Sequence, residues 1–307
     1  MIELFHIPQH NIDTSKFSHL LHDTVVTEFE NNFAEYVGAK YACSANSASS
    51  LLYLALRNRG ETINVPSTIP IVVPNVIANT RNTIRFYNDV DWVGSCYHLH
   101  DNIFDSAQEV TRNQYADLER DDALMIFSFY PTKPVSGCDG GMVVSNDKRQ
   151  IDNFRILTMN GTEFSTDSWS RKQVAAGYKM HCNSIQAYVA NKNLKKLDNK
   201  NSILDEIRTV YNAALGYNNT SRHLYRIRVK DNVKFIENMK KVGIQCGIHY
   251  EHCHTNPAYK FVRVASSGPM DRSIEESKST VSLPFHEGLS FSDVHKVIEY
   301  ATRNLQK

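Results

Sequence analysis

Two segments hold side chains that could do chemistry, and each follows an apolar stretch. Lys133 lies in the run Phe-Ser-Phe-Tyr-Pro-Thr-Lys that begins at Phe127, and Asp105 directly follows Ile103 and Phe104. An apolar strand that ends in this way delivers a polar side chain to the carboxyl edge of a sheet, where open α/β sheets bind ligands. We therefore expect a lysine and a carboxylate to lie close together at that edge.

A lysine beside a carboxylate suits the chemistry of pyridoxal phosphate. That cofactor needs a lysine that binds its aldehyde carbon as a Schiff base, and an acid that keeps its pyridine nitrogen protonated so that the ring accepts electrons. Taken alone, Lys133 is typical of an ordinary loop lysine and Asp105 of a helix N-cap. Their combination favours the cofactor hypothesis.

A third segment has the composition of a phosphate-binding turn. Small residues, among them Ala48 and Ser49, precede the helical run that starts at Leu51. Backbone N–H groups at a helix N-terminus bind phosphate, and a hydroxyl from Ser128 is a candidate second contact. The simpler alternatives are a helix cap and a strand-end hydroxyl.

These segments resemble, in order, those of the DegT/StrS family of sugar-nucleotide aminotransferases, which are fold-type I enzymes of pyridoxal phosphate. The resemblance spans nearly the whole chain. The matching segments are Asn46 to Ser50, Asp105 to Gln108, Ser128 to Lys133, Asp139 to Gly141, Gly177 to Lys179, Ile185 to Ala187, His223 to Tyr225, Gly243 to Ile244, Ile248 to Tyr250, and Ser282 to His286.

The resemblance implies roles for the cofactor-binding residues. Lys133 would be the Schiff-base lysine and catalytic base, and Asp105 would hold the ring nitrogen. Gln108 would lie near the ring oxygen. The phosphate would be bound by Ser128 and by the turn at Ala48 and Ser49.

Family enzymes are dimers in which the partner subunit adds a polar residue to each phosphate site. Lys179 or His181 is the candidate for that contribution. Substrate contacts are expected from Trp169 and Arg171, in the polar stretch 162–172, and from His249 and Tyr250.

The implied activity is transfer of an amino group, with glutamate as the expected donor, to a keto-deoxysugar carried on a nucleotide. One alternative is another pyridoxal phosphate reaction, such as sugar dehydration. Dehydratases of the family characteristically replace the Schiff-base lysine with histidine, so Lys133 favours transamination. A non-catalytic binding or regulatory homologue is the other alternative.

Two departures from the family pattern affect the site. Family members carry a longer stretch, including another βα unit, where this chain has only Trp92 to Phe104. The aromatic residue that usually follows the Pro-x-x-Thr turn is absent, since Ile69 and Pro70 follow Thr68. We expect a trimmed peripheral layer and an altered contact with the cofactor ring.

Hydrophobic periodicity predicts the elements that position these residues. The expected strands are 41–44, 62–65, 85–88, 102–104, 124–129, 141–145, 223–229 and 245–249. The expected helices are 16–39, 51–56, 75–79, 184–195, 201–215, 233–241 and 291–303. The pattern predicts an α/β protein of fold-type I, with a mainly parallel sheet flanked by helices. Its large cofactor-binding domain would span 1–200, including the N-terminal helix, and a small α+β domain would span 201–307.

Composition excludes some classes of function. The chain has 34 Lys and Arg against 33 Asp and Glu, so no summed charge attracts nucleic acid or an anionic membrane. The first residues lack the pattern of a secretory signal, and the most apolar stretch, 63–78, is interrupted by prolines. Scattered cysteines indicate reduced thiols and a cytoplasmic location. The run from Cys246 to His254 is rich in possible zinc ligands but lacks a second paired cluster, so no metal is expected.

Overall fold

A computed structural model describes residues 1–17, 24–163 and 170–305, which form two compact units. The five-stranded unit comprises residues 8–59 and 96–196, and the two-sheet unit comprises residues 1–7, 60–95 and 197–307. The boundary at 196/197 lies near the expected boundary at 200/201. Residues 1–7 and 60–95 nevertheless group with the later part of the chain, and the assignment of domains to 1–200 and 201–307 stays a prediction.

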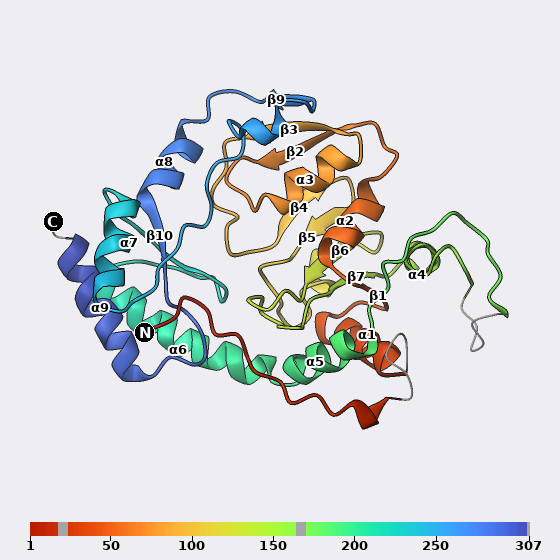
Figure 1. Cartoon of the computed structure of the whole chain (residues 1–307), viewed down its shortest axis with the longest axis horizontal. Helices are drawn as coiled ribbons and strands as arrows, with labels where there is room; N and C mark the ends of the chain where they lie inside the picture. Colours follow the sequence, from red (N-terminus) through yellow and green to blue (C-terminus); the bar gives the residue numbers. More distant parts are fainter. Residues whose placement is uncertain (18–23, 164–169, 306–307) are drawn as a thin grey trace. The chain divides into compact units, whose positions relative to one another are not determined.

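The sheet of the five-stranded unit has the order β1-β7-β6-β5-β4 (Figure 1). Its strands are β1 (Tyr41–Ala45), β4 (Tyr97–His100), β5 (Ile103–Asp105), β6 (Leu124–Ser128) and β7 (Gly141–Ser145). β5 and β6 are parallel, and β7 is antiparallel to both β1 and β6, so β1, β5 and β6 run in one direction. β4 is antiparallel to β5. The sheet is therefore mixed, with β4 and β7 reversed.

Helices cover this sheet because each carries an apolar face. They are α1 (Thr24–Val37), α2 (Ala48–Leu56), α4 (Lys148–Thr158) and α5 (Ser184–Leu194), with short 3-10 helices η1 (Thr14–Lys16) and η2 (Ala116–Leu118). Phe29 and Phe33 of α1 meet Phe127 and Phe129, with ring centroids 4.9–5.3 Å apart. Burial of such side chains contributes roughly 1.5–3 kcal/mol each, which fixes α1 against the strand that leads to Lys133.

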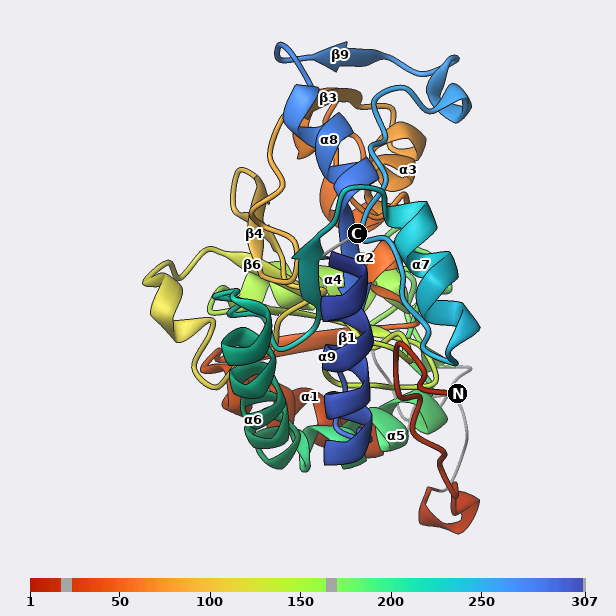
Figure 2. The same ribbon diagram turned by 90° about the vertical axis from the view of Figure 1, so that its left-hand side faces the viewer.

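Within its described residues, the two-sheet unit contains a parallel sheet, an antiparallel pair of strands and five α-helices. The first sheet is β2 (Thr62–Pro66), β3 (Thr83–Tyr87) and β9 (Val264–Ser266), and the pair is β8 (Tyr225–Arg228) and β10 (Thr280–Leu283). The helices are α3 (Val72–Asn79), α6 (Leu197–Leu215), α7 (Asn232–Lys241), α8 (Asp271–Ser279) and α9 (Phe291–Leu305), with the short η4 (Pro257–Tyr259). Residues of α6, α9, β8 and β10 form one apolar core. Figure 2 shows α6 and α9 side by side.

Most of the expected elements are confirmed, with ends that shift by a few residues. The helix expected at 51–56 begins at Ala48, and the one expected at 201–215 begins at Leu197. Within the expected helix 16–39, the structure shows α1, and residues 18–23 lie outside the described part. The elements β4, α4, α8, β9 and β10 were not predicted. Among the described helices, none is long and apolar enough to cross a bilayer.

The strand expected at 245–249 is wrong. Only Gly247 pairs there, as an isolated bridge with Ser282. Ile2 forms the other neighbouring contact, because its carbonyl accepts the N–H of Gln245 at 2.9 Å and its own N–H donates to Gly243 O at 2.8 Å. Backbone hydrogen bonds of the segment around Gln245 are thus made with Ile2, at the start of the sequence, and not with a regular neighbouring strand.

Candidate active site

The ends of four strands line up along one edge of the five-stranded sheet. Asp105, the last residue of β5, pairs with Ile126 of β6, and Ser128, the last residue of β6, pairs with Gly141 of β7. Gly141 in turn pairs with Ala45, the last residue of β1. The expected carboxylate, the expected hydroxyl and the start of the expected phosphate turn are therefore brought to a common edge.

Asp105 is a buried carboxyl group with three polar neighbours. Its Oδ2 accepts a hydrogen bond from Tyr97 Oη at 2.8 Å, and its Oδ1 accepts one from Ala107 N at 3.0 Å. Burial raises the pKa of Asp105, while the two hydrogen bonds and the charge of Lys133 act to lower it. These neighbours favour the ionised carboxylate that a protonated ring nitrogen requires.

Lys133 is half-buried and electrostatically coupled to Asp105. It follows β6 in a turn where its backbone N–H donates to Tyr130 O at 2.8 Å. Burial lowers the pKa of Lys133 from 10.5 to about 8, although the Asp105 carboxylate acts to raise it. A lysine with this pKa is partly neutral near pH 8, as a Schiff-base lysine and proton-transfer base must be.

The phosphate turn lies at the N-terminus of α2. Ser47 is its N-cap, with its hydroxyl oxygen accepting from Ser50 N at 3.2 Å, so Ala48 and Ser49 stand in the first turn. A side chain at Gly141 would place its Cβ 2.4 Å from Ala48 N, so only glycine allows this turn to approach β7. Backbone N–H groups at this position are suited to an anion.

A buried ion pair supports the strand that leads into this turn. Glu30 of α1 accepts hydrogen bonds from Ser44 N and Ser44 Oγ, both at 2.8 Å, and its other oxygen lies 2.8 Å from Arg155 Nη1. Arg155 also donates to Ala42 O at 2.8 Å. The end of β1 is therefore held in place from α1 and α4.

Lys179 and His181 were expected to reach the phosphate site of a partner subunit. Their segment lies beside the start of the phosphate turn of the same chain. Asn46 N donates to Met180 O at 2.7 Å, and His181 forms an isolated bridge with Ala45. Nδ1 of His181 is buried and has no hydrogen-bond partner among the described residues. Burial lowers the pKa of His181, as do the charges of Lys179 and Arg171, so these three basic side chains form a cluster. Lys179 itself is exposed.

The remaining predicted residues divide between the two units. Gln108 is buried just after Asp105, in the five-stranded unit. His249 and Tyr250 lie in the two-sheet unit, where His249 Nδ1 is 2.9 Å from Ser282 Oγ and the Tyr250 ring is parallel to that of Trp92, 6.4 Å between centroids. Trp169 lies outside the described residues.

The histidines near Cys253 have serine partners. His252 Nδ1 lies 2.7 Å from Ser277 Oγ, and His254 Nδ1 lies 2.7 Å from Ser67 Oγ. These hydrogen bonds tie the loop to α8 and to the residue after β2. The two side chains therefore have a structural role in the two-sheet unit.

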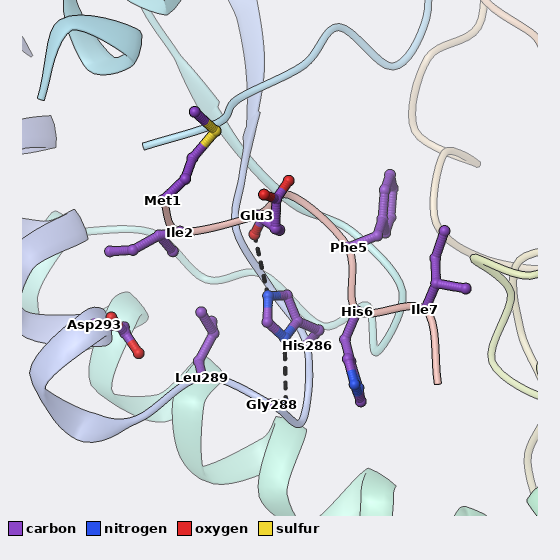
Figure 3. A pocket seen from close by; sticks show the side chains of 10 residues that line it. All are labelled: Met1, Ile2, Glu3, Phe5, His6, Ile7, His286, Gly288, Leu289 and Asp293. Atoms are coloured by element: carbon purple, nitrogen blue, oxygen red, sulfur yellow. Dashed lines mark hydrogen bonds between the residues drawn. The ribbon is translucent and has the colours of Figure 1, made fainter. Parts of the chain in front are cut away.

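A cavity of about 430 Å³ opens beside the N-terminal segment of the two-sheet unit (Figure 3). His286 lies in its wall, held by hydrogen bonds to Glu3 O at 3.1 Å and from Gly288 N at 3.2 Å. None of the predicted site residues lines this cavity. Its lining residues are thus different from those assigned to the cofactor.

The residues of the sheet edge fit pyridoxal phosphate. Lys133, whose pKa is lowered, is electrostatically coupled to the buried carboxyl group of Asp105. Gly141 allows the first turn of α2 to lie close to β7. Lys133 would hold the aldehyde carbon, Asp105 the ring nitrogen, and Ser49 with Ser128 the phosphate.

The sequence matches the DegT/DnrJ/EryC1/StrS aminotransferase family over residues 11–92 and 120–302, and the chain belongs to that family. It is an aminotransferase, and its cofactor is pyridoxal phosphate. The unmatched segment 93–119 contains β4, Asp105 and Gln108. The assignment of these residues therefore depends on the motif and on the geometry described above.

Named relatives cover almost all of the chain. A UDP-4-amino-4,6-dideoxy-N-acetyl-beta-L-altrosamine transaminase of Campylobacter jejuni is 24% identical over 369 residues, with 97% of this chain and 96% of the relative covered. The alignment is longer than the 307 residues of the chain. The relative thus contains insertions that this chain lacks, and the expected trimming before Asp105 stays a prediction.

Solved structures show the same fold. The aminotransferase TlmJ of Streptoalloteichus hindustanus has a TM-score of 0.81 at 20% identity and covers 100% of this chain and 99% of its own. The putative sugar aminotransferase Spr1654 of Streptococcus pneumoniae, in its PLP-form, has a TM-score of 0.79 at 18% identity with 98% of each chain covered. The α/β architecture of fold-type I, with sheets flanked by helices, is confirmed. Strands β2, β3 and β9 are parallel, and β1, β5 and β6 run in one direction, whereas β4 and β7 make the five-stranded sheet mixed.

Sequence reasoning missed Tyr97, the hydrogen-bond donor to Asp105. The sequence did contain a signal, because Tyr-His-Leu-His at 97–100 alternates apolar with polar residues, as a half-buried strand does. The segment was interpreted only as the remnant of a shortened region.

Proposed function

We propose that this aminotransferase transfers an amino group from an amino acid, with glutamate as the expected donor, to a keto-deoxysugar carried on a nucleotide. The observation that carries the proposal is the coupling of Lys133, with its pKa lowered to about 8, to the buried Asp105. The Campylobacter relative, named as a transaminase of a UDP-linked amino sugar, supports this substrate class.

Each group at the sheet edge has a defined task. When bound, the cofactor supplies an electron sink for the carbon that bears the amine. Neutral Lys133 Nζ would take the proton from that carbon and deliver it to the cofactor's aldehyde carbon, and in the second half-reaction it would move a proton in the reverse direction. Asp105 would hold the ring nitrogen and keep its proton in place. The N-terminus of α2, with Ser49 and Ser128, would anchor the phosphate, so that Lys133 could reach the reacting carbon.

Roles outside the sheet edge belong to the same proposal. Arg171, within the basic cluster with His181, is suited to an anionic group of the donor or the nucleotide. His249 and Tyr250 would contact the sugar, and Trp169 would join them. We also propose a homodimer in which Lys179 or His181 of a second copy reaches the phosphate, and a cytoplasmic location. Sedimentation equilibrium of the native protein tests the dimer.

The decisive test is absorption spectroscopy of the purified protein. Pyridoxal phosphate should produce a visible band in the native protein and in a Lys148→Ala control, whose side chain is exposed and pairs with Asp152. Lys133→Ala should show none. Glutamate should then convert the band to that of the pyridoxamine form, and a UDP-linked 4-keto-6-deoxyhexosamine should restore it with formation of an amino sugar.

Other outcomes identify the alternatives. A deoxygenated sugar without a new amine would indicate a dehydratase, a reaction that the retained Lys133 disfavours. A native protein that binds the cofactor and is inert toward every donor and keto-sugar would indicate a binding or regulatory homologue. Absence of the band in the native protein would overturn the proposal.

A further inference from the structure

β4 (Tyr97–His100) lies in the segment 93–119, which the family model does not match. Its first residue, Tyr97, pairs with Asp105 in the antiparallel register of β4 and β5. Side chains of directly opposed residues point to the same face of a sheet, so the phenol and the carboxyl group share one side. Their hydrogen bond, 2.8 Å from Tyr97 Oη to Asp105 Oδ2, joins two buried groups, 9% and 5% exposed.

The residues around Tyr97 are tied to the turn that follows Asp105. Cys96 N donates to Glu109 Oε2 at 2.9 Å. Ser106 Oγ donates to Glu109 O at 2.7 Å and accepts from Gln114 Nε2 at 2.6 Å. The start of β4 and the turn after β5 therefore form one hydrogen-bonded assembly, which restricts the positions available to the phenol.

The other groups that face Asp105 cannot replace this phenol. They are the N–H of Ala107, the ammonium of Lys133 and the thiol of Cys96, whose pKa burial raises to about 12. A neutral thiol adds no positive charge. The Lys133 ammonium loses its charge as the pH rises through about 8. Once the lysine nitrogen forms the Schiff base with the cofactor, no free ammonium group remains.

Two hydrogen-bond donors then remain, Tyr97 Oη and Ala107 N. They occupy one site on each oxygen of Asp105. A carboxylate offers about four acceptor sites, so both oxygens keep a site for the ring nitrogen. Hydrogen bonds to the charged form favour ionisation over protonation.

We propose that Tyr97 is a positioning residue, whose hydroxyl keeps the Asp105 carboxylate ionised and in a fixed orientation toward the ring nitrogen of pyridoxal phosphate. The inference rests on the proposed role of Asp105 in the aminotransferase. It assigns to the shortened segment a function in the site. Through Tyr97, β4 donates a hydrogen bond to Asp105, the residue proposed to hold the ring nitrogen of the cofactor.

The test compares Tyr97→Phe with the native protein and with Tyr115→Phe. The latter removes another buried phenol of the same unit, one that bonds to Ala123 O at the opposite end of β6. Pyridoxal phosphate binding is measured by absorbance titration, and protonation of nitrogen-15-labelled cofactor by NMR. Tyr97→Phe should weaken binding by about tenfold or more and move the ring nitrogen toward its unprotonated state. Tyr115→Phe should leave the nitrogen signal native.

A second pair of measurements needs no cofactor. Aspartate carboxyl carbons labelled with carbon-13 report the titration of Asp105, assigned with Asp105→Asn. The titration midpoint should rise in Tyr97→Phe. Fluorinated tyrosine incorporated at position 97, a stronger donor of unchanged shape, should lower it. This second variant keeps the test decisive if the phenylalanine variant folds poorly.

The outcomes separate this inference from the proposed function. Equal affinities and equal nitrogen signals in native protein and Tyr97→Phe would overturn the role of Tyr97 and leave the aminotransferase intact. A native protein that does not bind pyridoxal phosphate would overturn both. An unchanged Asp105 midpoint in both position-97 variants would also overturn the inference.

Discussion

The titration of Lys133 should be visible in the rate at which the cofactor-free protein captures pyridoxal phosphate. Burial lowers its pKa from 10.5 to about 8. Near pH 7 this shift enlarges the neutral fraction about 300-fold over an unperturbed lysine. Because only the neutral amine attacks an aldehyde, the capture rate should rise about tenfold per pH unit and level off above about pH 8.

The same shift should appear in the free energy of unfolding. The unfolded chain holds the Lys133 proton more tightly than the folded one, so stability rises with pH between about 8 and 10.5. The difference between 10.5 and about 8 corresponds to about 3 kcal/mol when fully developed. Buried thiols such as Cys43, with pKa raised to about 12, act in the opposite direction. Urea unfolding of the native protein is therefore compared with Lys133→Met at each pH.

Two variants control this experiment. Asp105→Asn removes the carboxylate that raises the pKa of Lys133, so the midpoint of the capture rate should fall below 8. Lys148→Met removes an exposed lysine and should leave the profile unchanged. A native midpoint near 10, together with equal pH dependence of stability in Lys133→Met, would refute the argument from burial.

Three further substitutions test the surroundings of the site. Glu30→Gln should cost about 2 kcal/mol in urea unfolding, because it removes the buried carboxylate that pairs with the partly exposed Arg155; a loss below about 0.5 kcal/mol would contradict that. Gly141→Ala should weaken pyridoxal phosphate binding by about tenfold or more, since its Cβ would meet Ala48 N, and native affinity in a titration would show that the turn is not the phosphate site. Ser282→Ala, which removes a hydrogen-bond partner of His249, should raise KM for the keto-sugar by about fivefold with little change in kcat, and an unchanged KM would show that this hydrogen bond does not position His249 for the substrate.

The central strands could be predicted because their apolar runs are local signals. Leu124 to Phe127 are continuously apolar and fully buried, as strands covered on both faces are. The helix α1 shows the helical spacing of its buried phenylalanines and ends before Gly38, whose φ of +77° suits a helix terminus. In such segments the periodicity of the apolar side chains and the residues at the ends of the element are sufficient to predict the helix or strand.

Other elements could not be predicted because their hydrogen-bond partners are distant in sequence. Gln245 N donates to Ile2 O, more than 240 residues away, and Gly247 forms only an isolated bridge with Ser282, so the strand expected at 245–249 has no continuous neighbour. β9 is three residues long and forms its bonds only in the presence of β3. A short segment has too few residues to show a period that distinguishes strand from loop.

The sequence by itself determined the chemistry that the site can perform. The types and order of Lys133, Asp105 and the phosphate turn indicated pyridoxal phosphate and the aminotransferase family, because motif residues stay recognisable without coordinates. The tertiary structure decided how these groups influence one another. The lowered pKa of Lys133, the hydrogen bond from Tyr97 to Asp105 and the close approach that Gly141 permits all depend on burial and distance. Those quantities exist only once separate strands have packed together.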